Sequence, residues 1–224
     1  MAKFLKPMST TAPKPFNAPA KPKPPLTPKG KHMARVYSIV DLGTQPEVYM
    51  GQPRMQHKVQ ITWEMPQLMH DFGKGMEPRA LSKRFTLSMS QKANLRKFVE
   101  AWRGEPFEND LKASEFDLRR LLGQKCWLTI AHKENEKKET TSFIFSCGMM
   151  TKEEVKLLPP PHNRPVCFLL GDGITSEVFK ELPDWQKEII MGCQEIKNAG
   201  STTQPDSTTT AAQADAAGDD DIPF

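Results

Sequence analysis

The chain has 224 residues, of which 38% are apolar and 20 are prolines, and its formal net charge is +4. This length suits one domain with tails or two small domains, and the composition indicates that part of the chain is not packed into a core. The sequence has no apolar run of the length that spans a membrane, and its first residues lack the apolar segment of a signal peptide. We therefore expect a soluble, cytoplasmic protein that does not enter a membrane.

Charge is spread unevenly along the chain. Residues 1–33 contain seven lysines and no acid, whereas residues 199–224 contain five aspartates and no base. The remaining residues, 34–198, are therefore nearly neutral. The sequence predicts three parts: a disordered basic arm, a folded body and a disordered acidic tail.

The basic arm contains eight prolines, which block helix and sheet and favour extended, polyproline-like shapes. Seven lysines on such an arm can bind phosphates without regard to sequence. A plain solubilising leader is an equally good interpretation. Met33 stands close enough to the first predicted strand to be an alternative start of the chain.

Three β-strands are predicted in the first half of the body. Apolar and polar residues alternate from Val36 to Val40, from Gln56 to Glu64 and from Leu81 to Ser88. The intervening segments, 43–53 and 65–78, contain glycines and prolines and are predicted to be turns and loops.

The periodicity then changes to that of a helix. Leu95, Phe98, Val99 and Trp102 are spaced at i, i+3, i+4 and i+7, which predicts an amphipathic helix with Ser90 as its N-cap.

Two more strands and two shorter helices complete the predicted body. A short helix is expected from Ser114 to Gly123 and a C-terminal helix from Trp185 to Ile196. Alternation predicts strands at Cys126–Ala131 and Ser142–Cys147, joined by the charged segment 132–139.

The predicted order of elements is strand, strand, strand, helix, strand, strand. This is the order of an oligonucleotide/oligosaccharide-binding (OB) fold, a small barrel with a helix between its third and fourth strands. We therefore expect a mainly β protein: an OB-fold barrel with helices and with disordered N- and C-terminal tails.

OB folds bind single strands with cations that track the phosphates and aromatic rings that stack on the bases, at about 1–3 kcal/mol per stacked base. Residues of these types on the predicted strands and loops are the candidates for DNA binding: Tyr37, Arg54, Lys58, Trp63, Lys83, Arg84, Trp127, Lys133, Lys137 and Lys138.

Strand alternation ranks some of these candidates. Trp63 shares its face with apolar neighbours, so core packing is favoured over stacking, whereas Trp127 is predicted to face outward and stack. Tyr37 fits either role. Lys83 shares a face with Phe85, so Arg84 is the better phosphate contact.

Enzymatic chemistry finds no support in the sequence. Nucleotide-binding, zinc-protease and serine-hydrolase motifs are missing, and the histidines are scattered. No C-x-x-C pair occurs among the four cysteines, which are expected to be reduced thiols: Cys126, Cys147, Cys167 and Cys193. We expect no catalytic activity, metal or cofactor.

The last six residues combine charge and apolar bulk: Asp219, Asp220, Asp221, Ile222, Pro223 and Phe224. Three adjacent carboxylates resist burial, and Pro223 favours an extended Ile222. The result is an acidic peptide with an apolar end, which suits a partner pocket with an apolar slot and a basic rim. The alternative is a solubilising acidic tail that happens to end in Phe224.

This hexapeptide resembles the C-terminal tip of bacterial single-stranded DNA-binding proteins, which docks into replication and repair enzymes. Three further segments, Val40–Gln45, Ser82–Ser88 and Leu182–Trp185, resemble the phage-encoded branch of these proteins. The inserted segment between strands and the C-terminal helix depart from the bacterial type, which leaves the oligomeric state open.

The resemblance implies a protein that binds and protects single-stranded DNA in phage replication and recombination without base specificity. Through the tip it would recruit a polymerase, helicase, primase or nuclease in the host bacterial cytoplasm. Two alternatives remain: a single-strand annealing or recombination factor, and a host-takeover adaptor that sequesters a replication enzyme without binding DNA.

The tail is also long enough to return to its own domain. A flexible chain of this length has an r.m.s. reach of about 28 Å. We therefore expect that the acidic tip can fold back onto the basic groove of the barrel and compete with DNA phosphates.

Overall fold

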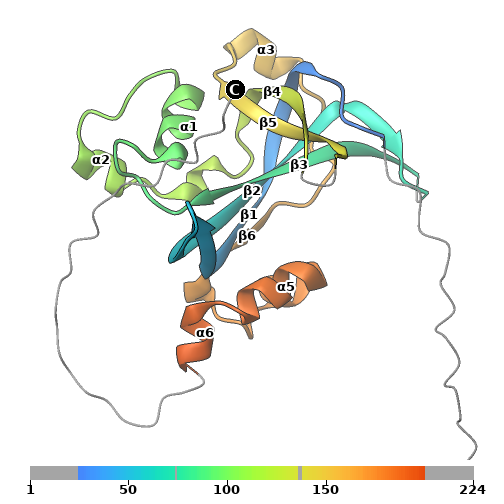
Figure 1. Cartoon of the computed structure of the whole chain (residues 1–224). Helices are drawn as coiled ribbons and strands as arrows, with labels where there is room; N and C mark the ends of the chain where they lie inside the picture. The colour runs from blue at the N-terminus through green and yellow to red at the C-terminus, as the bar shows by residue number, and fades with distance from the viewer. Residues whose placement is uncertain (1–24, 74, 136–137, 200–224) are drawn as a thin grey trace, which may run out of the picture.

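The computed structural model describes residues 25–73, 75–135 and 138–199. They form a mainly β body around a six-stranded sheet in the order β3-β2-β1-β4-β5, with β6 beside β1 (Figure 1). Neighbouring strands run antiparallel, except that β6 is parallel to β1. The strands are β1 (Gly30–Tyr49), β2 (Gln52–Asp71), β3 (Met76–Thr86), β4 (Lys125–Glu134), β5 (Thr140–Gly148) and β6 (Val166–Phe168). The prediction of a mainly β protein is confirmed.

The helices are short and lie between and after the strands. They are α1 (Asn94–Arg103), α2 (Asp110–Ser114), α3 (Lys152–Lys156), α4 (Glu177–Glu181), α5 (Asp184–Met191) and α6 (Gln194–Ala199), with 3-10 turns η1 (Leu118–Leu121) and η2 (Leu170–Asp172). In the described part of the chain, none of these helices has the length and apolar character needed to cross a membrane.

β1 and β2 are longer than the sequence predicts, with 20 residues each. The predicted turns at 43–53 and 65–78 are mostly paired strand that ends in tight hairpins, so those predictions are wrong. Pro46 is tolerated because the described part of β1 has only β2 as a neighbour at that point, which leaves one edge unpaired. A register shift between Asp41 and Gly43 lets the strand continue past the glycine.

The folded body also begins earlier than predicted. Gly30 to Met33 pair with β4, and the buried Thr27 carbonyl accepts hydrogen bonds from His132 Nε2 at 2.7 Å and Ser142 Oγ at 3.2 Å. The arm therefore does not extend to residue 33, and a chain started at Met33 would lose part of β1. Residues 1–24 of the arm lie outside the described residues.

One face of the sheet packs against α1 to form the main core. Trp63 of β2 is fully buried, with its ring centroid 5.6 Å from that of Phe98 and 6.2 Å from that of Trp102. The stripe predicted for this helix is therefore correct. Its N-cap is Ala93, which makes no side-chain cap bond, rather than Ser90.

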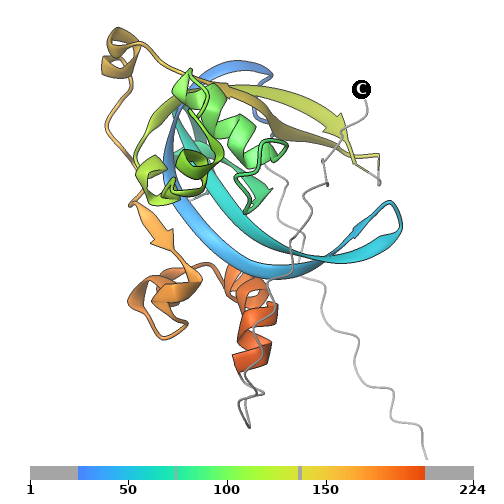
Figure 2. The same cartoon turned by 90° about the vertical axis from the view of Figure 1, so that its left-hand side faces the viewer.

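The opposite face of β1 is covered by the C-terminal segment. Val40 and Leu42 pack against Phe168, Phe179 and Ile190 in a second apolar cluster. Figure 2 shows α5 and α6 on the far side of the sheet from α1.

The single helix predicted from Trp185 to Ile196 is instead two helices, α5 and α6. The first helix ends at Met191 and the second begins at Gln194. In α5 the side chains of Gln186 and Ile190 are buried, whereas Trp185 is 47% exposed. Because α5 begins directly after Pro183, its helical positions are fixed from that residue, and this decides which side chains face inward. The sequence pattern alone does not reveal that orientation.

A buried ion pair joins the sheet to the C-terminal segment. The fully buried Glu64 carboxylate pairs with Arg35 Nη1 at 3.2 Å and accepts bonds from the backbone N–H groups of His162 and Asn163. Arg35 Nη2 in turn donates to the Pro159 carbonyl at 2.7 Å.

We expect Glu64→Gln to lower the free energy of unfolding by about 3 kcal/mol, because it leaves the Arg35 charge buried without its counterion. Urea denaturation measures this loss. The control is Glu153→Gln, at an exposed position of α3, and an equal stability of the two variants would contradict the role given to Glu64.

Candidate nucleic-acid interface

Alternate residues of β2 point away from the main core and form a polar row with their neighbours on β3. Lys58 Nζ donates to Gln56 Oε1 at 2.8 Å and to Thr86 Oγ1 at 3.1 Å, and Arg84 Nε donates to Gln60 Oε1 at 3.1 Å. With the aromatic residues beside it, this row is called the outer strip: Tyr49, Arg54, Gln56, Lys58, Gln60, Arg84, Thr86 and Trp185.

At one end of the outer strip, α5 brings an indole beside an exposed arginine. The guanidinium of Arg84 lies 5.8 Å from the ring centroid of Trp185, which is 47% exposed. A cation next to an accessible ring offers both a phosphate contact and a stacking face.

At the other end, the β1–β2 hairpin repeats this combination. The guanidinium of Arg54 lies 3.7 Å from the ring centroid of Tyr49. Apolar side chains project from the same hairpin, and Met50 at its tip is 85% exposed.

Between these ends the charge is partly neutralised. Lys58 Nζ pairs with Glu47 at 2.6 Å, and the lysine side chain is only 12% exposed. Lys58 therefore orders the strip rather than offering a free cation to DNA.

The β4–β5 hairpin carries the other predicted lysines. Lys133 is exposed and its Nζ lies 5.4 Å from the Phe143 ring, and the exposed Lys138 follows with a φ of 59°. Lys137 lies outside the described residues. Figure 2 shows that the β1–β2 and β4–β5 hairpins project toward the same side of the molecule.

Two predicted contacts lie on the core side of the sheet. Trp63 is fully buried, so the stacking alternative is wrong for it and core packing is correct. Lys83 points inward as its parity with Phe85 predicts, and its Nζ donates to the Ile144 carbonyl of β5 at 3.2 Å. Neither side chain belongs to the outer strip.

Tyr37 is also set apart from the strip. It lies half-buried at a register shift between Val36 and Ser38, where burial and the nearby Glu64 carboxylate raise the pKa of its hydroxyl. Tyr37 contributes to the packing around the buried ion pair.

Trp127 lies on the outward face of β4, but it has local partners. Its Nε1 donates to Glu154 Oε2 at 3.1 Å, and Lys31 Nζ lies 4.5 Å from the ring centroid. A base would have to displace Lys31 to stack on that face, so stacking on Trp127 stays a prediction.

Tyr49 and Trp185 are not among the contacts predicted from the sequence. Tyr49 lies within the segment predicted to be a turn, and Trp185 is the first residue of the predicted C-terminal helix, whose inward face the sequence analysis does not assign. Register between the paired strands, and the position of α5 beside β3, are what bring these rings to Arg54 and Arg84.

The four cysteines are free thiols, and Cys147 is buried in the core. Burial raises the pKa of Cys147 to about 12, so this thiol is neutral. Within residues 25–73, 75–135 and 138–199, no three side chains of histidine, cysteine, aspartate or glutamate are grouped to hold a metal ion.

A polar cluster ties α6 to the β1–β2 hairpin. His57 Nε2 lies 2.6 Å from Asp41 Oδ1 and its Nδ1 lies 3.7 Å from Glu195 Oε1, while Thr44 Oγ1 donates to Glu195 at 2.6 Å. Burial alone would raise the pKa of Glu195, but the bonds from Thr44 lower it to about 2. The hydrogen bond to Asp41 raises the pKa of His57.

Comparisons with known proteins add no assignment. No protein-family model matches the chain, and no curated protein matches it significantly.

We expect the stability supplied by His57 to be present at pH 6 and lost as the pH rises through its raised pKa, since the charged imidazolium is the form held by Asp41. Urea denaturation of wild type and His57→Gln between pH 5 and 9 should show a difference that shrinks with rising pH. His162→Gln, at an exposed position, should show no such trend. A constant difference would mean that His57 stays neutral.

Proposed function

We propose that the sheet is an OB-type barrel. The order β3-β2-β1-β4-β5, with α1 between β3 and β4 in the chain, is the arrangement expected of that fold. Lys83 supports closure, because its side chain bridges from β3 to the β5 backbone.

We propose that this barrel binds single-stranded DNA without base specificity. The observation that carries the proposal is the outer strip, which places Arg84 against an exposed Trp185 and Arg54 against Tyr49. Guanidinium groups contact any phosphate and rings stack on any base, so the pairing favours strands of any sequence.

The biological process that we propose follows from the resemblance of the tail to the tip of single-stranded DNA-binding proteins. The protein would coat and protect single strands in phage replication or recombination, and the tip, 219–224, would recruit replication or repair proteins. The tip lies outside the described residues, so its acidic and apolar sequence supports this part of the proposal.

We expect Arg84→Ala and Trp185→Ala each to weaken binding of a fluorescent oligothymidine by about five- to a hundredfold, the equivalent of one lost phosphate or stacking contact. Fluorescence anisotropy at several salt concentrations measures the affinities, which should fall steeply with salt. Lys180→Ala, on the exposed face of α4, is the control and should bind as wild type does.

Competition with duplex DNA tests the class of ligand. Equal affinity for duplex and single strands, or an affinity that does not change with salt, would rule out the proposed function. Rapid pairing of complementary strands would point instead to an annealing factor, and the absence of DNA binding to an adaptor.

For the tip, Phe224→Ala should leave oligothymidine affinity nearly unchanged and reduce capture of host replication proteins at least about tenfold, because it keeps the charge and removes the apolar anchor. Pull-down of purified replication proteins by wild type and variant measures this. Equal capture by both would mean that the tip is only an acidic tail.

A further inference from the structure

The β1–β2 hairpin has two faces of opposite character near its tip. Residues that stand directly opposite each other in paired strands share a face. Glu47 and Arg54 form one such pair, on the face of the outer strip. Two other pairs, Pro46 with Met55 and Val48 with Pro53, lie on the opposite face. Together with Met50 in the turn, these four residues are called the apolar hairpin face.

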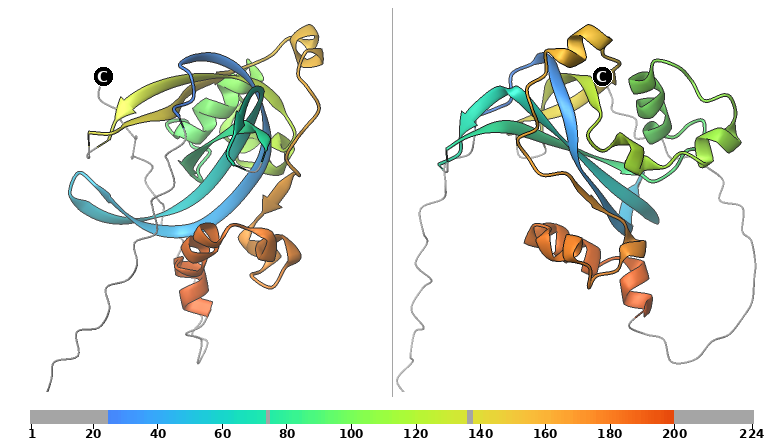
Figure 3. Two further views of the ribbon diagram at one scale, coloured as in Figure 1. Left: turned by 90° about the vertical axis from the view of Figure 1, so that its right-hand side faces the viewer. Right: turned by 180° about the vertical axis from the view of Figure 1, so that it is seen from behind.

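The exposure of the two faces reverses the usual pattern of a sheet, in which apolar side chains are covered and polar ones meet water. Val48 is 71% exposed and Met55 is 49% exposed, whereas Glu47 and Arg54 are half-buried. Between residues 44 and 56, all of which the structure describes, the apolar hairpin face carries no charged side chain. Figure 3 shows that the hairpin projects beyond the rest of the sheet, with α5 and α6 beside its base. An uncharged apolar surface on a projecting element is typical of a protein contact.

The tip of the hairpin holds a bulky side chain where the backbone favours a small one. Met50 and Gly51 have φ values of 47° and 76°, and positive φ at both positions is the condition of a type I′ turn. Asn or Gly is preferred at the first of these positions, so Met50 strains the turn. Strained residues gather at contact sites, and the side chain of Met50 is 85% exposed. Met50 therefore has the character of an anchor residue.

A groove of about 350 Å³ lies at the base of the same face, between the hairpin and α6. Pro46, Met55 and Gly192 form its apolar part, and three polar residues of α6 complete the lining. The groove is held in shape by Glu195 of α6, whose carboxylate accepts hydrogen bonds from the Thr44 N–H at 2.9 Å and from the Thr44 hydroxyl at 2.6 Å. It is therefore formed before any partner arrives.

We propose that a second copy of the chain docks on the apolar hairpin face in a two-fold arrangement, with Met50 of each copy seated in the groove of the other. A two-fold contact requires a surface that is complementary to itself. Met50 stands four residues from Pro46, which places the projection about 13 Å from the groove along the strand. A two-fold axis between them brings each projection over the groove of the other copy. An uncharged face cannot select a partner by opposite charge, but it matches an identical apolar face.

The area of this contact suits a weak dimer. Covering one side chain of this kind removes about 60–120 Å² from water, so the five residues bury on the order of 400 Å² in each copy. With the rim contributed by α6, the total approaches the roughly 1,000 Å² at which specific interfaces begin. We therefore expect a dissociation constant of about 1–100 μM. The outer strip lies on the other face of the hairpin, so it stays open in the dimer.

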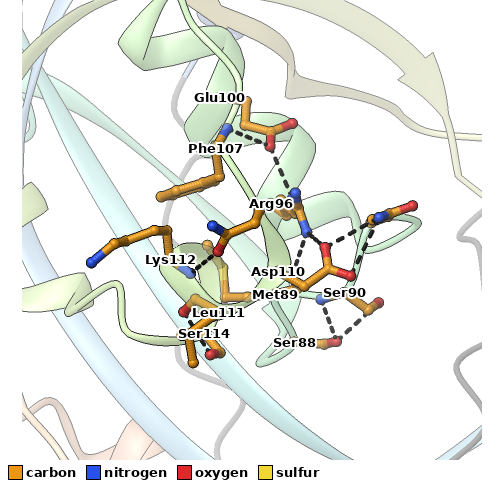
Figure 4. A network of polar contacts seen from close by, with 12 residues as sticks. Ser88, Met89, Ser90, Arg96, Glu100, Phe107, Asp110, Leu111, Lys112 and Ser114 are labelled. Atoms are coloured by element: carbon orange, nitrogen blue, oxygen red, sulfur yellow. Dashed lines mark hydrogen bonds and ion pairs between the residues drawn. The ribbon is translucent and has the colours of Figure 1, made fainter.

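Sedimentation velocity of the full chain without DNA, from about 0.1 to 300 μM, tests the proposal by mass action. Wild type should shift from monomer to dimer over this range. Val48→Glu should raise the dissociation constant at least about tenfold, because it buries a charge without a counterion. The matched control is Leu111→Glu, which places the same charge on another exposed leucine, in α2 beside the ion pair of Arg96 and Asp110 (Figure 4). This control should dimerise as wild type does.

Met50→Asn separates association from folding. Asparagine accepts positive φ in this turn, so at about 0.1 μM the variant should melt at the same temperature as wild type or higher. Its dissociation constant should nevertheless rise at least about tenfold, because the anchor is lost. A chain that stays monomeric throughout the range would overturn the proposal. Dimers that both hairpin variants leave unchanged would also overturn it, because the contact would then lie elsewhere.

Photo-cross-linking tests the two-fold arrangement. Benzoylphenylalanine in place of Met50 should cross-link to the groove around Met55 and Gly192 and give a product of dimer size. A product of monomer size, or a ladder of trimers and larger assemblies, would overturn the exchange of Met50 between two copies.

Discussion

The fully buried carboxylate of Glu64 is the constraint on which the C-terminal half of the fold depends. A charge with no exposure to water is tolerated only when it is paired and hydrogen-bonded, and Arg35 with the backbone of residues 162 and 163 supplies those partners. The segment after α3 is therefore held against β2. From this point the chain enters β6, which pairs with β1.

This anchoring divides the outward face of the sheet into a covered and an open part. Val40 and Leu42 of β1 are buried by the C-terminal helices, while Arg84 on β3 stays exposed. Trp185 stands at the boundary, because α5 buries Gln186 and Ile190 and turns the indole toward Arg84. A structural contact on β2 thus sets the geometry of the proposed DNA contact on β3.

Local periodicity was enough to predict the parts of the fold whose signal lies within a few residues. The stripe of α1 and the inward face of Trp63 follow from such patterns, and the mainly β character follows from the alternating strands. The bounds of β1 and β2 do not follow from local patterns. Pairing between the two strands keeps the backbone extended through glycines and prolines that locally favour a turn.

Gly43 shows why a glycine within β1 is mistaken for a turn residue when only the local sequence is considered. Its φ is 71°, and a Cβ at this position would lie 2.7 Å from the Cys193 Cβ. The glycine is needed for the approach of the chain at the start of α6, not for a turn. The candidate site shows the same limit: Arg54 and Arg84 were predicted from residue type, but their partner rings depend on strand register and helix rotation.

The outer strip holds its cations beside rings at two separated points, Arg84 with Trp185 and Arg54 with Tyr49. Between these points Lys58 is paired with Glu47, so the strip offers its cations where a ring stands beside them. This arrangement suits a polyanion that repeats phosphate and flat base along its length.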